Sequence, residues 1–168
     1  MPGPVEAHEF HPERELMVQV FPAHIDVVIL YTEAPGPRSD LFSLQFGLKG
    51  TPSGLLDTLA GRAILPRLLD GLQFEVLGEE PRTGEPEVRI RRHQGRLMAA
   101  AFVRYELPDL PDDQTRTVIV RGAPRSIEAT PTLLYAGKGL QPVGPPSELT
   151  TLRQGTEIRA TFRRALQE

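Results

Sequence analysis

Six arginines lie between Arg82 and Arg104, together with two glutamates, so this stretch has a local charge of +4. Arg89 and Arg91 alternate along a predicted strand, and Arg96 opens its predicted hairpin partner. We therefore expect these three guanidinium groups on one sheet face, where they could bind phosphate, an RNA backbone or an acidic protein surface. The alternative is an ordinary solvated face. Arg92 would point the other way or mark a bulge.

Three other polar residues belong to apolar strands. Asp26 lies within one predicted strand, and Arg104 and Glu106 lie at the end of another. They would be the polar groups of a small-ligand pocket if a cavity separates a helical segment from the sheet face that carries Ala99 and Ala101. Alternatively, Asp26 and Glu106 are edge charges that block unwanted strand pairing.

Other reactive side chains form no recognisable catalytic or metal-binding motif. His8, His11 and Glu13 could coordinate a metal, but zinc requires three or four ligands held by structure, and these residues lie on an apparent arm. The chain has no G-x-S-x-G or S-x-x-K motif, and Gly137-Lys138-Gly139 lacks Walker spacing. We predict no catalytic residue, no metal and no cofactor, and favour a protein that is not an enzyme.

The composition and the net charge exclude further classes of function. The 168 residues include no cysteine, which excludes disulfides, thiol catalysis and cysteine-ligated metals. The net charge of −3 argues against nucleic acid as a partner. Residues 1–84 carry 6 basic and 12 acidic groups, whereas 85–168 carry 13 and 10, so the halves have charges of −6 and +3. Such asymmetry favours self-association or a protein partner, unless the two halves interleave in the fold.

The sequence also carries an expectation about location. Residues 1–10 lack the basic stretch and apolar core of a secretory signal. The longest apolar runs, Val27–Tyr31 and Leu97–Val103, are too short to span a membrane. We expect a soluble protein without a membrane partner, located in the cytoplasm or within an assembled particle.

The elements that must position these residues are mostly strands. Residues 1–13 read as an N-terminal arm, and 14–168 as a single globular domain. Period-two alternation and β-branched content predict short strands, with Pro22 separating or bending the first two. The strands are predicted within Leu16–Val20, Ile25–Tyr31, Phe42–Leu48, Gln73–Leu77, Val88–Arg91, Leu97–Leu107, Thr117–Arg121, Thr132–Ala136 and Glu157–Arg163.

One region has helical spacing. Thr51-Pro52 has the order of an N-cap followed by proline, and leucines then recur at intervals near 3.6 residues as far as Leu72. Pro66 would kink the helix. We therefore predict an α+β fold: about eight short, mostly antiparallel strands, sandwich- or barrel-like, with a kinked helical segment around residues 52–72.

These observations favour a non-catalytic protein that acts through protein–protein contacts, as an assembly subunit or an adaptor. The first alternative is a small-ligand-binding or small enzymatic α+β domain. The second is nucleic-acid or phosphate binding through the hairpin of Arg89 to Arg96.

Overall fold

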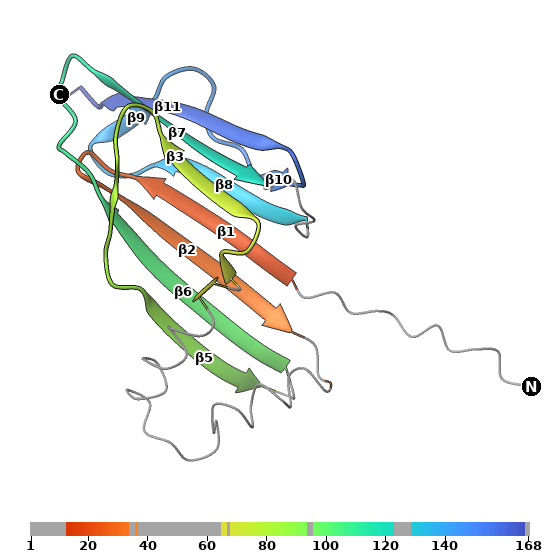
Figure 1. The fold of residues 1–168 in the computed structure, drawn as a ribbon. Coiled ribbons are helices and arrows are strands. Elements are labelled where there is room, and N and C mark those ends of the chain that lie inside the picture. The colour runs from red at the N-terminus through yellow and green to blue at the C-terminus, as the bar shows by residue number, and fades with distance from the viewer. Residues whose placement is uncertain are drawn as a thin grey trace, which may run out of the picture.

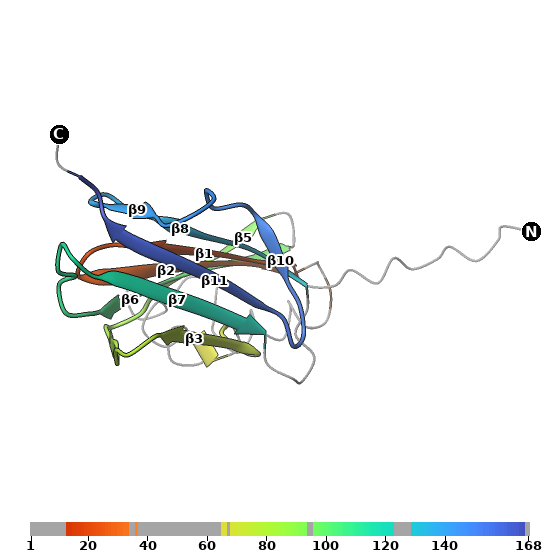
Figure 2. The ribbon, with the colours of Figure 1, turned by 90° about the horizontal axis from the view of Figure 1, so that it is seen from above.

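The structure is a computed structural model that describes residues 13–33, 36, 65, 66, 68–93, 96–122 and 129–166. These residues form eleven β-strands in two sheets (Figure 1). Buried side chains from both sheets make one core cluster. The described chain is thus a two-layer β-sandwich, and Figure 2 shows it turned by 90°.

The larger sheet has seven strands in the order β10-β8-β1-β2-β6-β4, and β5 also pairs with β6. All neighbours run antiparallel except β1 and β8, which are parallel. Its strands are β1 (Glu13–Val20), β2 (His24–Glu33), β4 (Arg82–Thr83), β5 (Glu87–His93), β6 (Arg96–Glu106), β8 (Thr130–Ala136) and β10 (Thr150–Leu152).

The smaller sheet has four antiparallel strands in the order β3-β7-β11-β9. They are β3 (Leu72–Val76), β7 (Thr115–Gly122), β9 (Leu140–Pro142) and β11 (Glu157–Arg164). Val118, Val120 and Phe162 are buried in the core that this sheet shares with the larger one.

Alternation explains which face of the larger sheet is buried. In β1, Leu16, Val18 and Val20 are buried, while the residues between them are less so. Successive side chains of a strand point to opposite faces, so the intervening residues face outward. The same alternation buries Ile25, Val27 and Ile29 of β2, and Leu97, Ala99, Ala101 and Val103 of β6.

The predicted α+β class is wrong, because the described residues are nearly all β in two mostly antiparallel sheets. Of the helical segment expected around 52–72, residues 51–64 and 67 lie outside the described residues. In the remainder, the Leu69 amide donates to the Leu65 carbonyl at 3.0 Å, which makes one helical turn. Leu72 already begins β3, where it is in register with Gly122. Pairing with a distant strand therefore outweighs the local leucine spacing at this position.

The strands predicted from alternation coincide with β1, β2, β3, β5, β6, β7, β8 and β11. The strand predicted at Phe42–Leu48 lies outside the described residues. The prediction missed β4, β9 and β10, which have two or three residues each. Such short strands carry too little alternation to be recognised, and their pairing comes from neighbours elsewhere in the chain.

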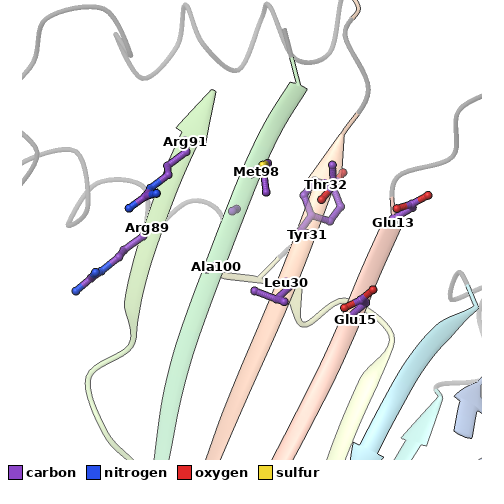
Figure 3. Close-up of a pocket in the computed structure, with 10 residues that line it drawn as sticks. Glu13, Glu15, Leu30, Tyr31, Thr32, Arg89, Arg91, Met98 and Ala100 are labelled. Carbon is purple, nitrogen blue, oxygen red and sulfur yellow. The ribbon is translucent and has the colours of Figure 1, made fainter. Parts of the chain in front are cut away.

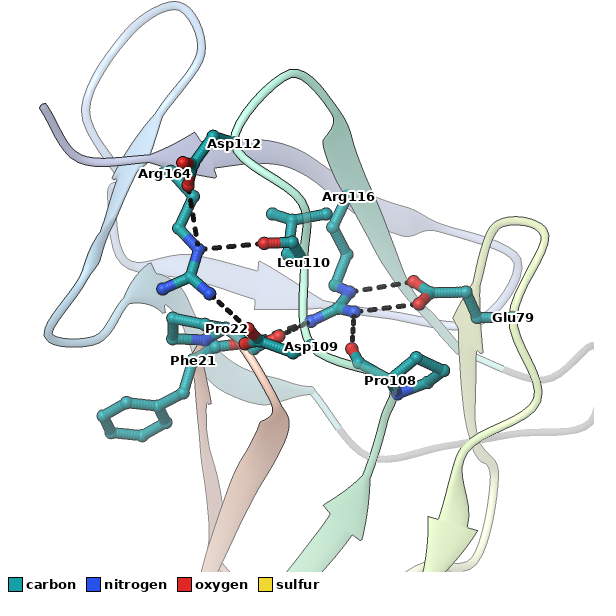
Figure 4. A network of polar contacts seen from close by, with 9 residues as sticks. All are labelled: Phe21, Pro22, Glu79, Pro108, Asp109, Leu110, Asp112, Arg116 and Arg164. Carbon is teal, nitrogen blue, oxygen red and sulfur yellow. Dashed lines mark hydrogen bonds and ion pairs between the residues drawn. The ribbon is translucent and has the colours of Figure 1, made fainter.

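Arg116 joins several connections at one end of the sandwich (Figure 4). Its guanidinium donates to both Glu79 carboxylate oxygens at 2.8 Å. It also donates to the main-chain carbonyls of Phe21 (3.2 Å), Pro22 (2.6 Å) and Pro108 (2.6 Å). All five N–H donors of the guanidinium are thereby used. One side chain of β7 thus binds three connections: the β1–β2 turn, the segment after β3 and the β6–β7 loop.

A second arginine lies beside this network. Arg164 of β11 donates to the Leu110 carbonyl at 2.9 Å and to the Asp109 carboxylate at 2.6 Å. Its Nε also lies 3.7 Å from the Asp112 carboxylate (Figure 4). The β6–β7 loop is therefore attached both to β7 and to the neighbouring strand.

Candidate functional site

The outward face of the seven-stranded sheet, called the outer face below, carries many apolar side chains. Sheets with one face toward water usually have polar residues on that face. Here Leu30 is 38% exposed and Met98 46% exposed, and further apolar residues between them and around them are half-buried. The outward apolar residues are Met17, Val28, Leu30, Met98, Ala100, Phe102 and Leu133.

Strand register makes this apolar surface continuous. Leu30 lies opposite Ala100, and Thr32 lies opposite Met98. One step along the strands, Met17 is opposite Val28 and also opposite Leu133 of β8. Opposite residues on one face have Cβ atoms about 5 Å apart, so their side chains touch. Contiguous apolar surface of this kind commonly marks an interaction site.

A groove of about 350 Å³ lies over β1, β2, β6 and β5 (Figure 3). One border consists of Glu13 and Glu15 of β1, called the acidic row below. The other consists of Arg89 and Arg91 of β5, called the basic row. Between the two rows the lining residues are Leu30, Tyr31, Thr32, Met98, Ala99 and Ala100.

The charged rows are exposed and largely unneutralised. Arg89 donates to the Glu87 carboxylate at 3.1 Å, and both side chains are well exposed. Within the described residues, Glu13, Glu15 and Arg91 have no ion-pair partner. A groove with opposite charges on its two borders can bind a partner whose charges are complementary to these borders. Its apolar floor supplies hydrophobic contact.

Asp26 and Arg104 form a bidentate ion pair on the same outer face. Arg104 Nε and Nη2 donate to the two Asp26 oxygens at 2.7 and 2.9 Å. The hydrogen bond to Asp26 raises the pKa of Arg104, which keeps its positive charge. His24 Nε2 lies 3.7 Å from Asp26, and the Arg104 guanidinium lies 5.9 Å from the Phe102 ring centre.

The sequence-predicted site residues divide into two groups in the structure. Arg89 and Arg91 line the groove, and the register puts Arg96 on the same outer face, at the start of β6. The β5–β6 pairing contains no bulge between Arg89 and His93. Arg89 and Arg91 thus lie on the border of the groove opposite the acidic row, rather than in a purely basic patch.

Asp26, Arg104 and Glu106 lie on the sheet face opposite the buried Ala99 and Ala101. Glu106 is exposed and is in register with His24 and Arg82. Asp26 and Arg104 satisfy each other across two strands. These residues therefore do not line an interior pocket on the Ala99 and Ala101 side of the sheet.

The acidic row and the apolar floor of the groove were not predicted from the sequence as parts of a site. Glu13 was assigned to the arm, although it begins β1. A usable signal was present in Val27–Tyr31, where apolar residues occupy both faces of one strand. Such a strand has an apolar outward side that a partner or another part of the protein can cover.

Among the described residues, no three or more His, Asp or Glu side chains gather as a metal would require. His8 and His11 lie outside the described residues. Gly137-Lys138-Gly139 makes a turn between β8 and β9, and the Gly137 amide donates to the Val20 carbonyl at 2.7 Å.

The described part of the chain contains no helix with the length and apolar character that crossing a membrane requires. Comparison of the chain with protein-family models, with curated proteins and with solved structures yields no match.

Proposed function

We propose that this chain is a non-catalytic structural protein that acts by protein–protein contact, as a subunit that associates with further copies of itself. The observation that supports this is the outer face, where an exposed apolar strip runs between an acidic and a basic row. One surface that carries both charges beside apolar groups can complement another copy of itself.

The mixed charge of the groove also separates this function from nucleic-acid binding. A phosphate backbone would meet the basic row favourably, but one that filled the groove would also contact the acidic row, which lies about three strand spacings, roughly 14 Å, from the basic row. A second copy presents both charge signs, so each row has an opposite charge to face.

Solution mass tests the proposal. We expect light scattering to give a mass above 18.6 kDa that rises with protein concentration and falls when Leu30→Glu or Met98→Glu is introduced. Both side chains are already partly exposed, so the variants are expected to fold. Leu149→Glu is the matched control, because Leu149 is 70% exposed and lies in a loop between β9 and β10. A monomer at every concentration would overturn self-association.

A further inference from the structure

Two neighbouring lines of register partners across the outer face share one charge order. Along one line of register partners, Glu15 of β1 is followed by Leu30, Ala100 and Arg89. Along the next line, Glu13 is followed by Thr32, Met98 and Arg91. Both lines run from negative charge through uncharged residues to positive charge, on strands β1, β2, β6 and β5.

This order restricts how two identical faces can meet. A two-fold axis that runs across the strands would set the acidic row of one copy against that of the other, which is repulsive. A two-fold axis parallel to the strands reverses the order in the second copy, so that each acidic row faces a basic row. Only the second arrangement is both closed and electrostatically favourable.

Resting on the proposed function, we propose that two copies pair through their outer faces about a two-fold axis that runs parallel to the strands, between β2 and β6. Glu15 then faces Arg89 of the second copy, and Glu13 faces Arg91. At the centre, Leu30 lies over Ala100 of the second copy, so a large side chain meets a small one. Thr32 lies over Met98 in the same way.

A second group of charges agrees with this arrangement. Asp26 of β2 and Arg104 of β6 are register partners on the outer face. The proposed axis places Asp26 of one copy over Arg104 of the other. Two ion pairs of this kind would stack with alternating charge, so each carboxylate gains a second guanidinium and each guanidinium a second carboxylate.

The dimensions of the surface predict a weak dimer. From β1 to β5 the surface spans three strand spacings, roughly 14 Å, and from Glu13 to Gln19 it extends about 20 Å along the strands. The flat area is thus about 300 Å² per copy, well below the roughly 800 Å² per partner of a standard interface. We expect association that depends on concentration and weakens with salt.

Charge reversal provides the test. One variant carries Glu13→Arg and Glu15→Arg, and the other carries Arg89→Glu and Arg91→Glu. Each variant has like charges on both borders, so each alone is expected to remain monomeric at concentrations where the wild type associates. An equimolar mixture is expected to restore association and to reach, but not exceed, twice 18.6 kDa.

Two matched controls have the same change in net charge at exposed positions outside the groove. They are Glu80→Arg with Glu148→Arg, and Arg153→Glu with Arg159→Glu. We expect both controls to associate as the wild type does. If they instead lose association to the same extent as the groove variants, net charge rather than the outer face controls the mass, and the proposed pairing is overturned.

Crosslinking tests the axis directly, because the chain has no cysteine of its own. Glu15→Cys and Arg89→Cys proteins are treated with a short thiol crosslinker, each alone and as a mixture. The proposed axis places these two positions opposite each other and separates identical positions by about three strand spacings, roughly 14 Å sideways. The mixture should form crosslinked dimers, and each single variant should not.

The remaining outcomes distinguish this inference from the proposed function. Masses that continue to grow beyond twice 18.6 kDa indicate an open assembly, which overturns the two-fold pairing and leaves a subunit function intact. If none of the groove variants alters association, the copies associate through another surface. That result also overturns the two-fold pairing and leaves a subunit function intact. A wild-type protein that stays monomeric up to about 1 mM overturns both proposals.

Discussion

Arg116 and Glu79 form an ion pair in which the guanidinium is fully buried and the carboxylate is partly exposed. Two parallel bonds of 2.8 Å join them, and the other donors of Arg116 bind three main-chain carbonyls. The residues come from β7 and from the segment that follows β3. This ion pair and the three carbonyl bonds therefore hold the connections together at one end of the sandwich.

Replacing Arg116 by methionine is expected to lower the free energy of unfolding by about 3–5 kcal/mol, because it leaves the carboxylate and three carbonyls without their donor. Urea denaturation measures the loss. Arg121→Met is the control, since Arg121 pairs with Glu75 and Glu157 at a partly exposed position, where screening by solvent leaves such pairs a much smaller contribution to stability. Equal losses in the two variants would contradict the structural role of Arg116.

Gly137 approaches an aromatic ring so closely that a side chain does not fit. A Cβ atom added at Gly137 would lie 2.5 Å from Cε1 of Phe21, whose ring stacks on His24 at a centroid distance of 4.5 Å. Gly137→Ala is expected to destabilise the protein by about 1–3 kcal/mol, because the ring must move. Thermal unfolding measures this effect. Gly36→Ala is the control, since an added Cβ there meets no atom within 4 Å.

Phe162 is the largest apolar side chain that the smaller sheet buries completely. Phe162→Ala removes most of its ring contacts and leaves a cavity, so we expect a loss of about 3–5 kcal/mol in the free energy of unfolding. Chemical denaturation measures the change. Leu166→Ala, at a residue that is 84% exposed, is expected to change stability by less than about 0.5 kcal/mol. A small effect at Phe162 would argue against the packing between the sheets.

Burial raises the pKa of Tyr105, which lies near the ring of Phe74. The unfolded chain therefore loses this proton at a lower pH than the folded protein does. The stabilising contribution is complete below about pH 10 and is lost as pH rises through the folded pKa. We expect the wild type to lose more stability than Tyr105→Phe between about pH 9 and pH 11. Parallel denaturation curves for the two proteins over this range would contradict the prediction.

Period-two alternation was sufficient to predict eight of the eleven described strands. The alternating apolar residues of these strands form the buried side, among them Leu16, Val18 and Val20 of β1, and Leu97, Ala99, Ala101 and Val103 of β6. A strand side chain points to one face or the other whatever its neighbours are, so the pattern can be recognised locally. Periodicity gave the wrong prediction at Leu72. Leucine spacing there predicted a helix, but Leu72 pairs with β7, and the local sequence does not reveal that pairing.

The candidate site depended on the tertiary structure much more than the strands did. The sequence by itself determined that Arg89 and Arg91 share a strand face, whereas it assigned Glu13 to the arm and did not predict the acidic row. Only the strand order β1-β2-β6-β5 brought these two rows to opposite borders of one groove, with Leu30 and Met98 between them. Strand order is decided by hydrogen bonding and packing between segments far apart in the chain. Local alternation therefore does not predict it.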